Sequence, residues 1–291
     1  MAFLTQEYGK GEKYMKRMLD FVRLHKQFAI LSALVFLLIL TAVSAPLWIK
    51  ISPYDSNLKD AFLPPGGEHL FGTDKLGRDV FSRVIYGSRI SLTSSLLLTI
   101  SVLFLGTVLG ITAGYFGGVI DTVVMRIADM LISFPGMVLA IAVAGIMGAS
   151  TMNAVIAILI VSWTKYARLA RSLVLKIRHK DYIYAALTTG SKNLYILKKY
   201  MLPNVMPTLI VTAASDIGTM MLELAGLSFL GFGAKPPLAE WGLMLNEGRI
   251  YMMDYPWLMI YPGFAICIVV VIFNLLGDSL RDILDPRNKT K

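Results

Sequence analysis

Long stretches without charge constrain the fold of this sequence more than any motif does. No Asp, Glu, Lys or Arg occurs between Arg89 and Asp121, or between Asp129 and Lys165. A helix needs about 20 apolar residues to cross the hydrocarbon core of a bilayer. The chain is 56% apolar and 16% charged, whereas soluble domains carry about 25% charged residues. The sequence therefore indicates an all-α membrane protein, and it excludes a disordered chain, a coiled coil and a disulfide scaffold.

The apolar stretches predict six transmembrane helices. The uncharged stretch between Asp129 and Lys165 is expected to form two of them, because Gly145, Gly148 and Ser150 mark a turn inside it. Small residues at Val43-Ser44-Ala45 resemble a signal-peptidase site, but the apolar run there exceeds the 7–15 residues of a signal peptide, so we expect a retained first span. The expected spans are 28–49, 92–115, a helix from about 121 to the turn, 152–173, 205–232 and 255–276.

Basic residues predict the orientation, because cytoplasmic loops are enriched in Lys and Arg. They concentrate in the segment 1–27, between the fourth and fifth spans, and after the sixth span, so we expect both termini in the cytoplasm. The loop 50–90 is then extracytoplasmic, and 91–291 forms a five-helix core with a cytoplasmic loop at about 174–204. The net charge of +9 fits contact with anionic membrane lipid rather than with nucleic acid.

The sequence contains no complete catalytic or cofactor-binding motif. The segment Gly72, Thr73, Asp74, Lys75, Leu76, Gly77, Arg78, Asp79 resembles a phosphate-binding loop, but such a loop ends in Lys followed by Ser or Thr. His25, His69 and His179 lie in separate segments, and no Cys-x-x-Cys pair occurs, so no metal site is expected. The chain is predicted to have no ATP site, no cofactor, no metal and no catalytic residues.

Two carboxylates interrupt the fifth span. Asp216 and Glu223 are seven residues apart, which places them on nearly the same helix face. An acidic residue at a helix centre costs roughly 2.5–3.5 kcal/mol on insertion scales. They are either contacts of a translocation path or gate, or buried structural ties, and Asp216 is expected near the membrane surface.

Other residues of the spans have spacings typical of structural roles. Arg126 and Asp129 are spaced for a local ion pair. The glycines of the second span favour close packing within the chain over a dimerisation face; they are Gly106, Gly110 and Gly114.

The cytoplasmic loop has the pattern of two short helices. Helix formers up to Thr189 are stopped by Gly190, and Ser191 could cap a second helix that Pro203 ends. Ala185 and Ala186 leave little bulk beside the bend. The pattern fits either a knob that enters a groove of a partner or a loop that lies on the membrane.

That loop resembles the conserved loop of binding-protein-dependent ABC importer permeases, in which Glu-Ala-Ala is followed by Gly and then by hydrophobic-x-Leu-Pro. Here the matching residues are Tyr184-Ala185-Ala186, Gly190 and Leu202-Pro203, with Tyr184 at the position where the family commonly has Glu. The segments 69–92, 227–242 and 277–287 are similar to signatures of the peptide and nickel permease group, and Gly72, Thr73, Asp74, Gly77, Arg78 and Asp79 belong to the first of them.

The resemblance implies a type I (MetI-like) importer permease in a bacterial or archaeal cytoplasmic membrane. Its partners would be a second, unlike permease subunit, two cytoplasmic ATPase subunits that bind ATP and Mg, and an extracytoplasmic substrate-binding protein. Family members work by alternating access, with the loop coupling ATPase motion to the helices. The cargo stays open among dipeptides, oligopeptides, nickel and nickel chelates.

Two hypotheses from other classes remain. A gradient-driven secondary transporter would use Asp216 and Glu223, and would often contain an internal repeat; we find no convincing one. A structural membrane partner would need neither these carboxylates nor the loop.

Overall fold

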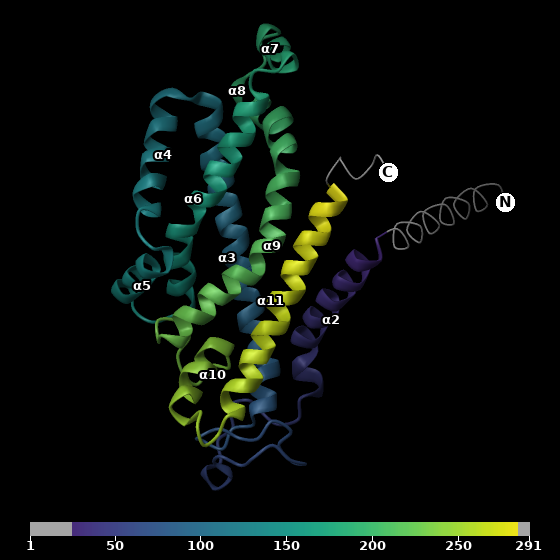
Figure 1. The fold of residues 1–291 in the computed structure, drawn as a ribbon, viewed down its shortest axis with the longest axis vertical. Coiled ribbons are helices and arrows are strands. Elements are labelled where there is room, and N and C mark those ends of the chain that lie inside the picture. Colours follow the sequence, from purple (N-terminus) through teal and green to yellow (C-terminus); the bar gives the residue numbers. More distant parts are fainter. Residues whose placement is uncertain (1–24, 285–291) are drawn as a thin grey trace, which may run out of the picture.

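The structure is a computed structural model that describes residues 25–284. Nearly all of the segment 1–27, which was predicted to be cytoplasmic, and the end of the chain after Leu284 lie outside the described residues. Within them the fold is helical, and the pair Thr73–Asp79 forms an isolated bridge. The helices run along the long axis of the molecule (Figure 1).

The described elements follow the predicted order. They are α2 (Lys26–Trp48), η1 (Leu58–Asp60), α3 (Val80–Phe116), α4 (Gly118–Ile132), α5 (Gly136–Met147), α6 (Thr151–Ile177), α7 (Asp181–Thr188), α8 (Asn193–Ile196), a π turn (Leu197–Met201), α9 (Leu202–Phe229), α10 (Trp241–Gly248), η3 (Arg249–Tyr251) and α11 (Trp257–Leu284).

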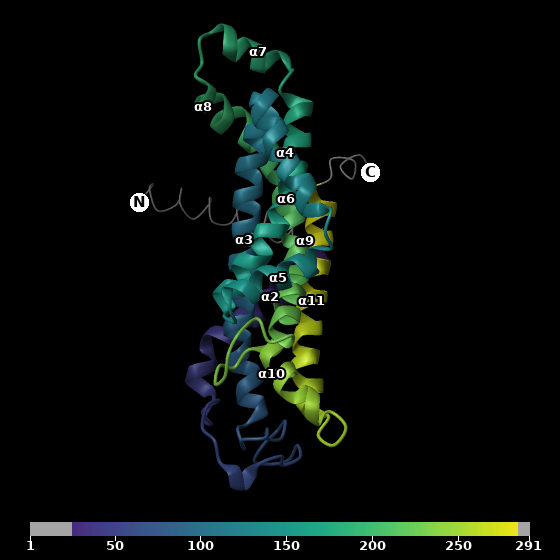
Figure 2. The same ribbon diagram turned by 90° about the vertical axis from the view of Figure 1, so that its left-hand side faces the viewer.

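The helix α6 lies at the centre of the bundle. It packs against α3, α5 and α9, while α11 packs against α9 and α2. The buried face of α6 includes Tyr166, Ala167, Ala170 and Val174. The short α10 fills the space between α3, α9 and α11 at one end. The views in Figures 1 and 2 agree on this elongated arrangement.

The glycines of α3 allow α6 to approach closely. A Cβ atom on Gly106 would lie 2.4 Å from the Tyr166 Cβ, and one on Gly110 would lie 2.3 Å from the Ala167 carbonyl oxygen. Gly114 likewise faces Val174. Packing within the chain, favoured by the sequence, is therefore confirmed.

The predicted count of six spans is not confirmed. Between His25 and Leu284, four helical stretches are long and apolar enough to cross a membrane: α2, α3, the continuous stretch from α8 through α9, and α11. The pair α4 and α5 would make a fifth, but it is bent by 93°. The expected third span is therefore not one straight helix. Pro135 lies in the break, where it cannot donate a backbone hydrogen bond and disfavours helix in the residue before it.

Two further differences from the sequence prediction concern α6 and α3. α6 is 27 residues long and contains the predicted span 152–173, but it is not among the helices of residues 25–284 that are apolar enough to count as a span. α3 begins at Val80 rather than near 92, because Asp79 caps it: the Asp79 carboxylate accepts a hydrogen bond of 2.7 Å from the Ser82 N–H. A capping side chain satisfies one of the orphan N–H groups at a helix start.

α7 and the segment between α2 and α3 lie at opposite ends of the molecule. α7 lies at one end, and the segment between α2 and α3 lies at the other end with α10 (Figure 1). The sides of the membrane on which these segments and the termini lie stay predictions.

Candidate functional sites

The loop after α6 projects beyond the bundle and carries α7 at its tip (Figures 1 and 2). α7 ends at Thr188, and Gly190 has a φ of +79°, as the sequence predicts for a helix stop. The Ser191 N–H donates to the Ala186 carbonyl and the Gly190 N–H donates to the Leu187 carbonyl, both at 3.0 Å. These two bonds form a Schellman motif, which needs a left-handed residue at the position of Gly190.

The second half of the loop corrects two expectations. α8 begins after Lys192, with no side-chain cap, so Ser191 does not cap it. Pro203 does not end the helix either, because the helical stretch continues from Asn193 to Phe229. The π turn at Leu197–Met201 comes directly before Pro203, at the first residues of α9. A wider turn accommodates the proline, whose ring and missing N–H disturb a regular α-helix.

α7 divides into a buried and an exposed face. Ile183 and Ala186 are buried, whereas Ala185 and Leu187 are exposed. Tyr184 is 49% exposed, and its hydroxyl lies 2.8 Å from the Nδ1 atom of His179. The hydroxyl at the family's Glu position therefore contacts this chain itself.

Asp216 is buried and paired. Its carboxylate forms an ion pair of 2.6 Å with Lys165 and accepts a hydrogen bond of 2.9 Å from the Tyr166 hydroxyl. Asp216 therefore lies inside the bundle, and its expected position near the membrane surface stays a prediction. Both partners lie on α6, about 50 residues earlier in the chain, and no spacing in the sequence pointed to them.

Glu223 lies two turns further along α9 and is half-buried. Within residues 25–284 it makes no hydrogen bond or ion pair, although Asp216 and Lys165 are close enough to act on it electrostatically. The structure thus separates the two predicted path residues into one that is satisfied and one that is not.

Two ion pairs join α4 to α6. Arg168 contacts Asp129 at 2.6 Å, and Arg171 contacts Asp121 at 2.5 Å. The predicted local pair of Arg126 with Asp129 is therefore wrong. Asp129 pairs with Arg168 of the neighbouring helix α6 instead, because the arginines of α6 lie against α4.

The segment from Gly72 to Asp79 forms a buried charge cluster. Arg78 and Arg83 are 2% and 1% exposed. Arg78 contacts Asp74 at 2.6 Å, and both arginines contact Glu247 of α10, at 3.1 and 2.9 Å. This cluster fastens the segment to α10, and the role of Glu247 had no signal in the sequence.

The remaining signature residues shape the same segment. The Thr73 hydroxyl accepts from the Leu63 N–H at 2.8 Å and donates to the Asp60 carbonyl. Gly77 has a φ of +73°, and a Cβ there would lie 1.8 Å from the Asn57 carbonyl oxygen. Gly72 has a φ of +74°. All these contacts are internal ties of the fold.

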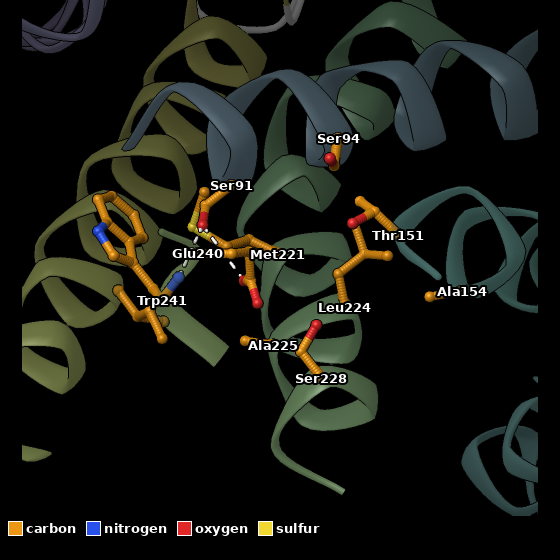
Figure 3. A pocket seen from close by; sticks show the side chains of 11 residues that line it. Ser91, Ser94, Thr151, Ala154, Met221, Leu224, Ala225, Ser228, Glu240 and Trp241 are labelled. Atoms are coloured by element: carbon orange, nitrogen blue, oxygen red, sulfur yellow. Dashed lines mark hydrogen bonds between the residues drawn. The ribbon is translucent and has the colours of Figure 1, made fainter. Parts of the chain in front are cut away.

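A small cavity lies between α3, α6, α9 and α10 (Figure 3). Its water-accessible space of about 10 Å³ suits roughly one water molecule. Glu240 accepts hydrogen bonds of 2.9 and 2.8 Å from the Gly242 and Leu243 N–H groups, and it contacts the Ser91 hydroxyl at 3.3 Å. Burial raises the pKa of the Glu240 carboxyl above its ordinary value, while these hydrogen bonds act in the opposite direction.

No group of three His, Cys, Asp or Glu residues arranged to hold a metal ion occurs between His25 and Leu284.

The apolar helices long enough to cross a membrane, with a two-helix loop that projects beyond them, are the architecture of an integral membrane protein. Residues 106–290 match the family described as binding-protein-dependent transport system inner membrane component, and the chain belongs to this family.

Three curated relatives indicate which members of this family the chain is similar to. The chain is 44% identical over 252 residues to the dipeptide transport system permease protein DppC of Alkalihalophilus pseudofirmus, covering 87% of this chain and 83% of the relative. It is 41% identical to the nickel transport system permease protein NikC of Escherichia coli, covering 89% and 93%. It is also 41% identical to the glutathione transport system permease protein GsiD of Pectobacterium atrosepticum, covering 92% and 90%. These are peptide and nickel ABC permeases, as the sequence motifs indicated.

The fold agrees with a solved importer. The inward-facing MetNI methionine ABC transporter superposes with a TM-score of 0.56 over 69% of this chain and 96% of that chain, at 17% identity. The MetI-like fold of type I importer permeases is therefore confirmed.

Proposed function

We propose that this chain is a transmembrane permease subunit of an ATP-driven, binding-protein-dependent importer in a bacterial or archaeal cytoplasmic membrane. Its cargo class would be di- or oligopeptides, or nickel in free or chelated form. The support is the identity of 41–44% to permeases of dipeptide and nickel systems over most of their lengths. Family membership also favours this function over a gradient-driven transporter that uses Asp216 and Glu223.

The proposed complex contains a second permease subunit, two cytoplasmic ATPase subunits that hold ATP and Mg, and an extracytoplasmic substrate-binding protein. This chain contributes no bond-making chemistry. It converts a difference in docking energy between two conformations into a shift of their populations, and alternating access follows from that shift.

The observation that carries the coupling role is the exposed α7, which projects from the bundle and ends in the left-handed Gly190. Its exposed residues Tyr184, Ala185 and Leu187 offer a partly apolar surface for an ATPase subunit. Ile183 and Ala186 hold the helix from the other side, and Leu202 and Pro203 begin the span that the loop would move.

The proposed path runs beside α9. A groove of about 500 Å³ is lined by Asp216 and Ser215 of α9 and by Asp278 and Arg281 of α11. Its charged lining suits a hydrated route for polar cargo, because ionisable residues within membrane helices normally face a bundle interior or an aqueous cavity. Glu223, without a hydrogen-bond partner between residues 25 and 284, is the proposed contact further along this helix.

The test of coupling uses Gly190. A Cβ at this position meets nothing within 4 Å, so a substitution acts through its positive φ alone. Gly190→Val should be strained, whereas Gly190→Asn should be tolerated, because Asn adopts the left-handed region readily. Gly231 has a φ of +91°, the same pair of Schellman hydrogen bonds after α9 and the same open surroundings, and provides the control Gly231→Val.

The measurement is uptake and ATP hydrolysis by the complete reconstituted complex. We expect Gly190→Val to lower uptake and to raise the ATP hydrolysed per substrate, while Gly190→Asn and Gly231→Val stay near wild type. Normal coupled uptake by Gly190→Val would refute the coupling role. Purification of the chain without a second permease and ATPases would refute the importer function itself.

A further inference from the structure

Two hydrogen bonds tie the projecting loop to the end of α3, one from each limb of the loop. Arg178, directly after α6, donates through Nη1 to the Gly114 carbonyl at 3.0 Å. Tyr115 donates through its hydroxyl to the Asn193 Oδ1 atom, at the start of α8, also at 3.0 Å. The two contacts therefore bracket α7 and lie on consecutive residues of α3.

From this geometry we infer that α3 is the element that carries loop motion to the opposite end of the permease, and that Arg178 and Tyr115 are the positioning residues that fasten the loop to it. The inference rests on the proposed coupling role of the loop.

The Arg178 contact is a capping interaction at a helix end. The last four carbonyl groups of a helix lack partners within it. In α3 the Ala113 carbonyl accepts from the Gly117 N–H, and the Gly114 carbonyl accepts from Arg178. A cation at a helix C-terminus is also favoured by the helix dipole. Arg178 thus binds the end of α3 through both charge and hydrogen bonding.

The same arginine connects to α7. Its Nε donates to the His179 Nε2 atom at 2.8 Å. Because Nε2 is the acceptor, Nδ1 carries the proton and donates to the Tyr184 hydroxyl at 2.8 Å. A continuous chain of hydrogen bonds therefore runs from the α3 carbonyl to the exposed face of α7. It ends at Tyr184, the residue that departs from the family pattern.

The far end of α3 is fastened as firmly. The Trp241 indole donates to the Val84 carbonyl at 2.8 Å, and Arg83 contacts Glu247 at 2.9 Å. Both partners lie on α10. The 37 residues of α3 span about 55 Å at 1.5 Å per residue. Glycine contacts hold the last third of α3 closely against α6, and the helix continues without a break to its contacts with α10, so a displacement of the loop reaches α10 through a stiff element.

The variants remove single bonds without large changes of volume. Tyr115→Phe removes only the hydroxyl, and Arg178→Met keeps an extended apolar stem. Asn193→Leu removes the acceptor, whereas Asn193→Asp retains one and should restore the contact. Lys176→Met is the matched control, because Lys176 is an exposed cation in the last turn of α6 that makes no hydrogen bond or ion pair with residues 25–284.

The first measurement is ATP hydrolysed per substrate transported by the complete reconstituted complex. We expect Arg178→Met, Tyr115→Phe and Asn193→Leu to raise this ratio about two- to tenfold, the factor that one net hydrogen bond carries in an equilibrium. Asn193→Asp and Lys176→Met should match wild type, and ATPase subunits should co-purify at the wild-type ratio throughout.

The second measurement is the ATP-dependent change at α10, read by a spin label on Ile250→Cys in a Cys267→Ala background. Ile250 is 77% exposed and follows α10 directly. We expect the change in wild type and its loss in the double variant Arg178→Met, Tyr115→Phe.

Three results would overturn the inference: an unchanged ratio in the variants, a retained signal at residue 250, or loss of ATPase binding, which would make the contacts part of the docking surface. Gly190→Val in the same preparation tests the proposed function separately. Gly190→Val could uncouple ATP hydrolysis from uptake while Arg178→Met, Tyr115→Phe and Asn193→Leu do not. In that case the coupling role of the loop stands and the inference about α3 fails.

Discussion

Lys165 and Asp216 form an ion pair of 2.6 Å between α6 and α9, and the two partners differ sharply in exposure. The side chain of Lys165 is 58% exposed, whereas that of Asp216 is 11% exposed. Removing one partner leaves the other uncompensated, and the cost depends on which charge stays behind. A half-exposed lysine can extend its ammonium toward water, but a buried carboxylate cannot.

This asymmetry predicts that Lys165→Met destabilises the protein more than Asp216→Asn does. Breaking a fully buried pair costs about 3–5 kcal/mol. Because more than half of the Lys165 side chain is exposed, we expect about 1–3 kcal/mol for Lys165→Met and less for Asp216→Asn. Thermal unfolding of the detergent-purified complex measures both, with Lys176→Met as the neutral control. Equal losses for the two variants would contradict the assigned asymmetry.

The contact between α3 and α6 predicts an unusual cost for a small substitution. Gly110→Ala places a Cβ 2.3 Å from the Ala167 carbonyl oxygen, so the helices must separate, at about 1–3 kcal/mol. Gly145→Ala meets only the Phe232 ring at 3.5 Å. It should be neutral or stabilising by up to about 1 kcal/mol, as alanine is favoured over glycine in helices. Gly110→Ala should lower the midpoint of thermal unfolding. Gly145→Ala should leave the midpoint unchanged or raise it.

Glu247 is predicted to be the most sensitive carboxylate outside the spans. It neutralises two arginines that are almost completely buried, so Glu247→Gln leaves them with Asp74 as the nearest anion. The loss of a buried partner is worth about 3–5 kcal/mol. Glu68→Gln makes the same chemical change at an exposed site and should stay within about 0.5 kcal/mol of wild type. Yield of folded protein and unfolding temperature should separate the two variants clearly.

Glu240 predicts a pH dependence of stability. Burial raises the pKa of its carboxyl in the folded state above the ordinary 4.5, so the folded state binds more protons than the unfolded state between these two values. The contribution of Glu240 is fully present below the ordinary value and is lost as the pH rises through the raised one. The unfolding temperature of wild type relative to Glu240→Gln should therefore fall with rising pH in that window. A difference that is constant with pH would show that Glu240 is ionised alike in both states.

The sequence predicted those elements whose cause is local. The first span was expected at 28–49 and is α2 (Lys26–Trp48), because an uninterrupted apolar run needs no partner to be recognised. The stop at Gly190 was likewise visible, since a Schellman motif depends on a glycine and its immediate neighbours.

Two of the missed features depend on residues far apart in the chain. α3 starts twelve residues before the expected 92: Asp79 caps it, and Arg83, which hydropathy treats as solvent-exposed, is neutralised by a carboxylate 164 positions later. The partner of Asp129 proved to be on α6 rather than one turn away. In both cases tertiary contacts outweighed a sound local rule. The third miss is local: the helix continues through Pro203, and a π turn precedes the proline.

The polarity of α6 has a consequence for how the chain is made. Lys165 and Arg168 emerge from the ribosome some 50 residues before Asp216 but after Asp129 and Asp121. The partners of Arg168 and Arg171 on α4 are already synthesised when α6 is complete, whereas the partner of Lys165 is on α9, which is synthesised later. We therefore expect the ion pairs between α4 and α6 to form before the Lys165–Asp216 pair during biogenesis.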